Sequence, residues 1–168
     1  MAVILETERL ILRKFVVGDA AFMLQIMNDP TWLKYIGDRN VHSVRDAEEY
    51  LINGAMQSYE ANGFGFYIVL LRESLEPIGT CGLAKRDFLD LPDFGFAFLP
   101  SYTGKGFAFE VAEASLTFAG DELGLKELLA ITLPKNERSI RLLEKLGFSF
   151  VKSFNEANEV VSLYRIAL

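Results

Sequence analysis

One change of pattern constrains most of what this chain can fold into: an apolar, β-rich run turns directly into a helix through a glycine turn. The run from Phe94 to Leu99 ends at Pro100, and apolar residues recur at helical spacing from Phe107 onward. Between them lies Gly104 to Gly106. Such a turn gathers unpaired backbone N–H groups and the positive end of a helix dipole. The sequence therefore predicts a mixed sheet-and-helix fold with an anion site at this turn.

The rest of the chain continues this mixed pattern over 168 residues, and we expect a single domain spanning 1–168. Trp32 and Tyr35 fall in a short segment that we expect to be irregular. The predicted class is α/β (α+β), with the element order βααβββαβαββ. The expected elements are a strand over 9–13, a helix from 18–19 to 28–30, a helix over 43–62, strands over 64–71, 77–84 and 94–99, a helix from 106 to 124, a strand over 128–133, a helix over 136–146, and strands over 148–154 and 159–167.

Charge and hydropathy exclude two classes of partner. Lys and Arg number 17 against 23 Asp and Glu, so the formal net charge is −6 and no basic field is available for nucleic acid. No stretch approaches the roughly 18 uninterrupted apolar residues that a membrane span requires. The first nine residues also lack the basic and apolar regions of a secretory signal. We therefore expect a soluble cytoplasmic protein with neither nucleic acid nor membrane as its partner.

Two residue counts narrow the chemistry further. Cys81 is the single cysteine and His42 the single histidine, which excludes an internal disulfide and a Cys/His zinc cluster. No metal is expected, although a site built from carboxylates alone stays open. A Ser-His-Asp hydrolase would need His42 and a G-x-S-x-G elbow, and that motif does not occur. Most conventional hydrolases are thereby excluded.

The glycine turn fits neither common nucleotide loop. A Walker A loop requires Ser or Thr after Gly-Lys, and a dinucleotide fingerprint requires glycine where Phe109 stands. Two interpretations stay open, an anion cradle assisted by Lys105 and a tight turn whose glycines only relieve strain. Further along, positive charge crowds the start of the helix at 136–146, where it opposes the dipole unless an anion is near. Those residues are Lys135, Arg138 and Arg141, and ordinary surface ion pairs are the alternative.

Two separated stretches carry a family resemblance. The sequence from Asp93 to Glu110 and that from Asn136 to Phe148 closely resemble the GNAT superfamily of acetyl-CoA-dependent N-acetyltransferases. Two more, Glu6 to Arg13 and Ile78 to Leu83, are similar to the branch that acetylates the amino termini of ribosomal proteins. The four motifs occur in the expected order, and the resemblance covers residues 7 to about 154.

The resemblance implies a mixed, mostly antiparallel twisted sheet that is flanked by helices and splayed at its centre. The splay would separate the strand ending at Leu99 from the strand ending near Leu133, with acetyl-CoA in the gap. Strand backbone would pair with the pantetheine arm, the amides of the glycine turn would hold the diphosphate, and the Asn136 side-chain amide would bind the arm. The implied cofactor-binding residues are Phe96, Ala97, Phe98, Leu99, Thr103, Gly104, Lys105, Gly106, Phe107, Ala108, Asn136, Ser139 and Arg141.

The chain departs from the family pattern at three positions. Ser101 stands where Gln or Arg often begins the diphosphate loop, which removes one side-chain contact but leaves the backbone cradle. Phe109 replaces a residue that is often Thr in the ribosomal branch. Leu143 stands where many members carry the tyrosine that protonates the leaving thiolate. The resemblance therefore leaves the general acid of this chain open.

Candidate catalytic residues follow from what amine acetylation requires: a neutral amine, a polarised thioester and a route for two protons. Asp93 matches a position that is often Glu in the resembling branch, so it is a candidate base, or else a solvated turn carboxylate. Ser139 lies one helical turn after Asn136, where it would relay a proton to the thiolate or serve as an ordinary polar residue. For Cys81, buried packing is favoured over service as a nucleophile. Backbone N–H groups near Phe96 to Phe98 are the expected polarisers of the thioester.

The acceptor would be recognised outside these motifs, by Trp32, Tyr35, Arg39 and the helix that begins near Ser43, although Trp32 and Tyr35 are also typical core residues. The acidic net charge favours a cationic acceptor. The leading function is acetyl transfer from acetyl-CoA to a primary amine by direct attack, with a protein N-terminal amine as acceptor. The alternatives are a small-molecule amine such as a polyamine or aminoglycoside, and a non-catalytic acetyl-CoA sensor. Exposed hydrophobic residues leave a homodimer open.

Overall fold

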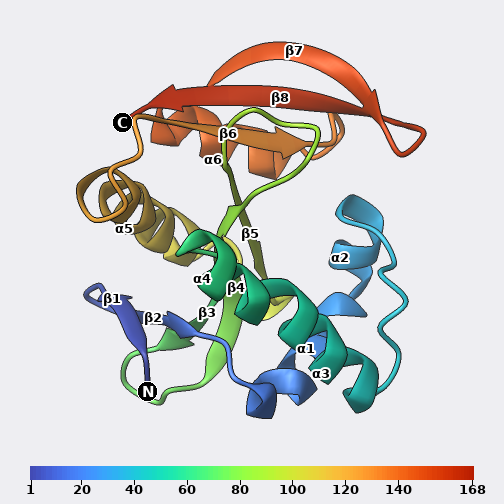
Figure 1. Cartoon of the computed structure of the whole chain (residues 1–168), viewed down its shortest axis with the longest axis vertical. Helices are drawn as coiled ribbons and strands as arrows, with labels where there is room; N and C mark the ends of the chain where they lie inside the picture. The colour runs from blue at the N-terminus through green and yellow to red at the C-terminus, as the bar shows by residue number, and fades with distance from the viewer.

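The computed structural model describes residues 1–168 and contains one eight-stranded sheet with the order β1-β2-β3-β4-β5-β6-β8-β7. All neighbouring strands are antiparallel except β5 and β6, which run parallel. Figure 1 shows β1 to β4 in the lower part of the molecule, β5 rising through the centre, and β6 to β8 in the upper part. The strands are β1 (Val3–Glu6), β2 (Leu10–Lys14), β3 (Phe66–Leu71), β4 (Pro77–Ala84), β5 (Asp93–Phe98), β6 (Glu127–Thr132), β7 (Ser149–Glu156) and β8 (Glu159–Ala167).

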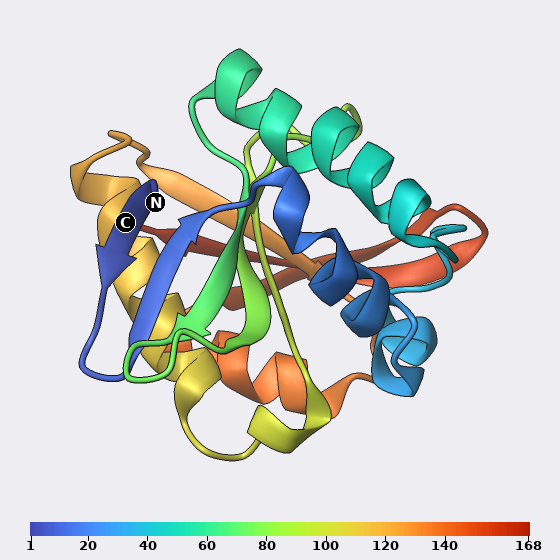
Figure 2. The ribbon, with the colours of Figure 1, turned by 90° about the horizontal axis from the view of Figure 1, so that it is seen from below.

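Helices cover both faces of this sheet, and Figure 2 shows the two layers on either side of the strands. Helices α1, α3 and α4 lie on one face, and α5 and α6 lie on the other. The helices are α1 (Ala20–Met27), α2 (Pro30–Tyr35), α3 (Val44–Leu51), α4 (Gln57–Asn62), α5 (Phe107–Asp121) and α6 (Glu137–Leu146), with short turns η1 (Val17–Asp19) and η3 (Pro100–Tyr102) and a π-helical turn η2 (Ile52–Met56).

Side chains along the central strands alternate between the two faces of the sheet, and they form two hydrophobic cores. Leu10 and Leu12 of β2 pack with α5 in one core, whereas Ile11 between them packs with α1 and α3 in the other. Successive side chains of a strand point to opposite faces, so a run of apolar residues in β2 and β3 serves both layers. The resulting three layers fix the position of β5, the strand that borders the gap in the sheet.

The sheet is splayed between β5 and β6, as the family resemblance implies. The two strands share a single paired position, Asp93 with Leu129, and the Leu129 N–H donates to Pro92 O at 3.0 Å. By contrast, β4 and β5 pair over six positions and β6 and β8 over six. The strands therefore meet at the start of β5 and diverge toward its end, which leaves one edge of β5 open.

The structure differs from the predicted order by added elements, and it divides the helix predicted over 43–62 into α3, the π-helical turn η2 and α4. Strand β1 precedes the first expected strand and pairs with β2 through an irregular register. Helix α2 replaces the irregular segment expected around Trp32 and Tyr35, because the residues interpreted as a helix stop also begin a helix. Asp29 caps α2 by accepting from the Thr31 N–H at 2.9 Å, and Pro30 occupies the first helical position. The predicted cap of α3 is confirmed, since Ser43 Oγ accepts from the Asp46 N–H at 3.0 Å.

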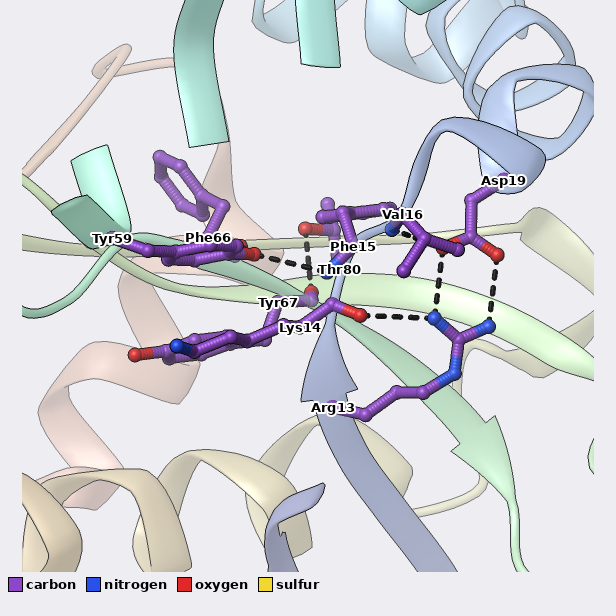
Figure 3. A network of polar contacts seen from close by, with 9 residues as sticks. All are labelled: Arg13, Lys14, Phe15, Val16, Asp19, Tyr59, Phe66, Tyr67 and Thr80. Atoms are coloured by element: carbon purple, nitrogen blue, oxygen red, sulfur yellow. Dashed lines mark hydrogen bonds and ion pairs between the residues drawn. The ribbon is translucent and has the colours of Figure 1, made fainter. Parts of the chain in front are cut away.

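A polar network joins the end of β2 to the turn η1 and to helix α4 (Figure 3). Arg13 donates two hydrogen bonds of 2.8 Å to Asp19, and Tyr59 of α4 accepts from the Phe15 N–H and donates to the Phe66 carbonyl. The ring of Tyr59 stacks on Tyr67 with centroids 5.3 Å apart. Burial raises the pKa of Tyr59, so its hydroxyl keeps the proton it donates. The network fixes α4 against β3, beside the gap in the sheet.

Candidate active site

The open edge of β5 presents backbone groups with no partner strand. Leu99 donates its N–H to Ile78 O at 2.9 Å, which places the polar groups of Leu99 and Ala97 on the β4 side. The intervening residues Phe96 and Phe98 therefore direct their N–H and C=O groups toward the gap. Their side chains pack against the core beneath α5. An extended ligand in the gap would meet these groups as a neighbouring strand would.

The turn after β5 collects a second set of free amides. Gly104 and Gly106 adopt positive φ angles of +73° and +83°, a region that side chains disfavour. Gly106 caps α5 without a side-chain hydrogen bond, and the first bond of the helix runs from the Glu110 N–H to Gly106 O. No N–H from Gly104 to Ala108 donates within the chain. This arrangement is suited to an anion such as a diphosphate.

Arg9, in the loop just before β2, binds this turn from outside the gap, and the sequence patterns did not point to this contact. Arg9 donates from Nε to Glu110 Oε1 at 2.8 Å and from Nη1 to the Lys105 carbonyl at 3.1 Å, and its guanidinium lies 4.3 Å from the Phe107 ring centroid. Thr7 donates its hydroxyl to Glu110. Partial burial opposes ionisation of Glu110, but hydrogen bonds from Thr7 and Arg9 outweigh it and lower the pKa.

The start of α6 faces the same gap from the β6 side. Asn136 caps the helix, with Oδ1 accepting from the Ser139 N–H at 3.3 Å, so its Nδ2 group stays free to donate. Arg141 Nη1 lies 3.8 Å from Oε2 of Glu137, one helical turn earlier, in an exposed ion pair. The basic residues of this region line the cleft described next. They are Lys135, Arg138, Arg141 and Lys145.

A cleft of about 1830 Å³ connects these features. It runs from the glycine turn past the open edge of β5 to the helices α2 and α3. Three candidate residues lie outside its lining: Leu99 packs into the core, Lys105 lies over the Tyr102 ring, and Phe107 lies under Arg9. The candidates that line it are Trp32, Tyr35, Arg39, Asp93, Phe96, Ala97, Phe98, Thr103, Gly104, Gly106, Ala108, Asn136, Ser139 and Arg141.

Asp93 lies at the point where β5 and β6 meet, and it is not a solvated turn carboxylate. Its side chain is 2% exposed and accepts from Arg86 Nε at 2.9 Å. Burial raises the pKa of Asp93, and the charge and hydrogen bond of Arg86 oppose that rise. The sequence alternation of the strand gave no signal for Arg86, which comes from the loop between β4 and β5.

The other end of the cleft is lined by α2, the helix that begins near Ser43, and the tip of the β7–β8 hairpin. Trp32 is 8% exposed, and its Nε1 is the one buried side-chain nitrogen or oxygen without a hydrogen-bond partner. The π-helical turn η2 contributes Asn53 and Gly54 to the lining. Further acidic and aromatic residues, unmarked by any sequence motif, are Asp29, Glu49, Tyr50, Phe66, Phe88, Glu156 and Glu159.

Comparison with known proteins agrees with this geometry. The profile of the acetyltransferase (GNAT) domain family matches residues 9–149, most of the chain. The chain belongs to the GNAT acetyltransferase family. The uncharacterized N-acetyltransferase p20 of Bacillus licheniformis is 30% identical over 171 residues, which cover 98% of this chain and 94% of p20. The protein is therefore an acetyltransferase enzyme.

Solved structures share the fold over nearly the whole chain. A putative GNAT-family acetyltransferase from Bordetella pertussis matches with a TM-score of 0.83 and 25% identity, covering 98% of this chain and 99% of its own. RimL, a ribosomal L7/L12 alpha-N-protein acetyltransferase solved with coenzyme A, matches with a TM-score of 0.83 and 15% identity. The match covers 99% of this chain and 98% of RimL. The microcin C7 self-immunity acetyltransferase MccE, solved with acetyl-CoA and AMP, matches with a TM-score of 0.83 and 13% identity. The match covers 96% of this chain and 94% of MccE. At these two lower identities the likeness concerns the fold.

Several residues of interest do not join the cleft. Cys81 is fully buried, 3.6 Å from Ser115 Oγ, and burial raises the pKa of its thiol to about 12, consistent with packing. His42 lies exposed in the loop before α3, near Asp38 and Asn28. No group of three or more His, Cys, Asp or Glu side chains is arranged to hold a metal ion, and no helix combines the length and hydropathy needed to span a bilayer.

Proposed function

We propose that this chain transfers an acetyl group from acetyl-CoA, bound between β5 and β6, to a primary amine. The observation that carries the proposal is the open edge of β5 ending at a turn of free amides. Phe96 and Phe98 offer backbone groups to an extended arm, and Gly104 to Ala108 offer N–H groups to a diphosphate beyond it. An open strand edge followed by a turn of free amides suits a ligand with a linear amide-containing arm and a diphosphate.

Residues on the β6 side complete the proposed cofactor site. The free Nδ2 of Asn136 would donate to a carbonyl of the arm, while Lys135, Arg138 and Arg141 offset the negative charge of the phosphates. Coenzyme A and acetyl-CoA are the ligands of RimL and MccE, which share this fold. Acetyl-CoA is here a substrate, and the proposed reaction requires no metal ion.

The proposed chemistry is direct attack. The neutral amine nitrogen bonds to the thioester carbonyl carbon, the C–S bond breaks, and the products are an amide and coenzyme A. Asp93 takes the amine proton through a water, because its carboxylate is buried where the strands meet. The sulfur takes a proton from the Ser139 hydroxyl or from water. The N–H groups of Phe96 and Phe98 are the candidates for polarising the thioester oxygen.

For the acceptor we propose a protein N-terminal amine, as in the ribosomal branch that Glu6 to Arg13 resembles. Beyond the proposed cofactor site, the cleft continues along α2 and α3, which leaves lining residues for an acceptor. Asp29, Glu49, Glu156 and Glu159 favour a positively charged amine at this end of the cleft. Trp32, Tyr35 and Arg39 would contact the residues that follow the amine.

The position of Leu143 supplies no acid to the leaving thiolate. Leu143 is 1% exposed and packs in the core. Under the proposed chemistry the proton of the sulfur therefore comes from Ser139 or from water.

The first experiment is thermal unfolding with and without excess acetyl-CoA. A ligand at about 100 times its Kd adds roughly 2.7 kcal/mol, which raises Tm by about 5 to 10 °C for a chain of this length. A panel of peptides with free or blocked amino termini, polyamines and aminoglycosides then follows, with thiol release as the readout. Absence of a shift at millimolar acetyl-CoA contradicts the proposal. A shift without thiol release for any of these acceptors would contradict the proposed acceptor class and leave the cofactor site supported.

A further inference from the structure

Arg9 reaches the diphosphate turn from a distant part of the sequence. It lies in the loop just before β2, and its Nη1 donates to the Lys105 carbonyl at 3.1 Å. Its Nε and its backbone N–H donate to the two oxygens of Glu110 at 2.8 and 3.0 Å. A Cβ placed on Gly106 would lie 3.3 Å from Arg9 Nη2. The guanidinium therefore packs directly against the outer side of the turn.

The bond to the Lys105 carbonyl determines which way one peptide group faces. In a trans peptide the C=O and the following N–H point in opposite directions. When the Lys105 carbonyl points at Arg9, the N–H of Gly106 points away from Arg9. Gly106 lines the cleft, whereas Lys105 and Arg9 do not. The contact thus turns the Gly106 N–H toward the space between β5 and β6.

This peptide group needs an external restraint. The peptide joins Lys105 to Gly106, whose φ is +83°, and glycine populates φ of either sign at little cost. Rotation about ψ of Lys105 and φ of Gly106 can therefore exchange the positions of the C=O and the N–H. The rotated form would present a carbonyl oxygen to a diphosphate and repel it. Only a group that binds the Lys105 carbonyl from outside the cleft selects the productive orientation.

Glu110 holds Arg9 in place for this task. The carboxylate accepts from Thr7 Oγ1, the Arg9 N–H and Arg9 Nε, and it sits in the first turn of α5, one turn after the peptide that Arg9 binds. The flat guanidinium also stacks on Phe107. These contacts leave the side chain of Arg9 one orientation, with Nη1 toward the turn.

We propose that Arg9, fixed by Glu110, is a positioning residue that orients the Lys105–Gly106 peptide so that the Gly106 N–H binds the diphosphate of the acyl donor. Arg9 lies outside the cleft and acts through its hydrogen bond to the Lys105 carbonyl. It rests on the proposed binding of acetyl-CoA between β5 and β6. It adds a specificity for donors that contain a diphosphate, since a donor without one gains nothing from the oriented N–H.

The test compares two donors in the same variants. Acetyl-CoA contains the diphosphate, and S-acetylpantetheine ends before it. For Arg9→Ala we expect kcat/KM with acetyl-CoA to fall about 10-fold or more, and kcat/KM with S-acetylpantetheine to stay within about 2-fold of the unmodified chain. Calorimetric binding of coenzyme A should weaken by the same factor. Arg9→Lys keeps the charge but cannot bridge Glu110 and the Lys105 carbonyl, so we expect it to behave like Arg9→Ala.

Arg72→Ala is the matched control. Arg72 Nη1 donates to the Thr7 carbonyl at 3.0 Å, in the loop between β1 and β2 that also contains Arg9, and Arg72 has no hydrogen bond or ion pair with residues 104–110. We expect its coenzyme A affinity to be unchanged. Equal losses with both donors in the Arg9 variants, or unchanged coenzyme A binding, would overturn the proposal for Arg9. If the unmodified chain itself binds no coenzyme A, the proposed function fails first, so the two failures are distinguishable.

Discussion

Arg86 donates from Nε to Asp93 Oδ1 at 2.9 Å, directly beneath the point where β5 and β6 separate. The pair holds a carboxylate at the one position where the splayed strands meet. A buried carboxylate with a raised pKa is a suitable proton acceptor for an amine that attacks above it.

If Asp93 is the base, Asp93→Asn should lower kcat on the order of 100-fold or more at neutral pH. The deficit should shrink as the pH approaches the pKa of the acceptor amine, because the amine then arrives without its extra proton. The measurement is the pH profile of thiol release. Asp87→Asn is the control and should retain activity, because Asp87 is exposed in the loop between β4 and β5. A deficit that is constant with pH would reject Asp93 as the base.

The same carboxylate should leave a signature in the pH dependence of stability. Burial raises the folded pKa of Asp93 above the usual 3.8, so folding favours its protonated form. Its contribution to stability is fully present below pH 3.8 and is lost as the pH rises through the folded pKa. Relative to Asp93→Asn, the unmodified chain should therefore lose free energy of unfolding from about pH 4 upward. Parallel curves for the two proteins in chemical denaturation at each pH would contradict this.

The glycine turn can be tested with a matched pair of substitutions. Gly104 and Gly124 both have positive φ, +73° and +68°, and an added Cβ would meet nothing within 4 Å at either position. Alanine at each should cost about 1 to 2 kcal/mol of folding stability through backbone strain. Only Gly104→Ala should also weaken coenzyme A binding, because only Gly104 lines the cleft. Equal affinities of the two variants would show that this turn does not hold the cofactor.

Trp32 offers a test of the acceptor side. Trp32→Phe keeps an aromatic ring in the core and removes the unpartnered Nε1. If that N–H donates to the acceptor, KM for the amine should rise about 5- to 10-fold, while coenzyme A affinity stays unchanged. Folding stability should not fall by the loss of a hydrogen bond, since none is present in the free protein. An unchanged KM for every acceptor tested would remove Trp32 from the recognition surface.

The order of elements was largely predictable because local signals and packing agree in this chain. Ser43 and Gly147 mark helix ends by caps whose geometry depends on neighbouring backbone alone, and both are confirmed. The same local logic failed at Asp29-Pro30, since this dipeptide ends one helix and begins another. Strand β1 was missed because its four residues alternate weakly, with only partial burial at Ile4 and Leu5.

The partners of the site residues were the least predictable part. Arg86 meets Asp93 only because β4 and β5 pair, and Arg9 meets Glu110 across 101 residues because β2 lies beside α5. Neither contact follows from spacing along the chain. The β4–β5 register also decides which residues of 96–99 face the gap. In this register the amides of Phe96 and Phe98 are open, and the Leu99 N–H donates to Ile78 O.

The most direct test of a cofactor site between β5 and β6 is residue-resolved amide hydrogen exchange with and without coenzyme A. The amides of Phe96, Phe98 and 104–108 have no partner within the chain, whereas the N–H of Leu99 already donates to Ile78 O. We expect coenzyme A to slow exchange at the first group of amides and to change the exchange of Leu99 little. Protection confined to another surface, or no protection at these amides with coenzyme A bound, would contradict it.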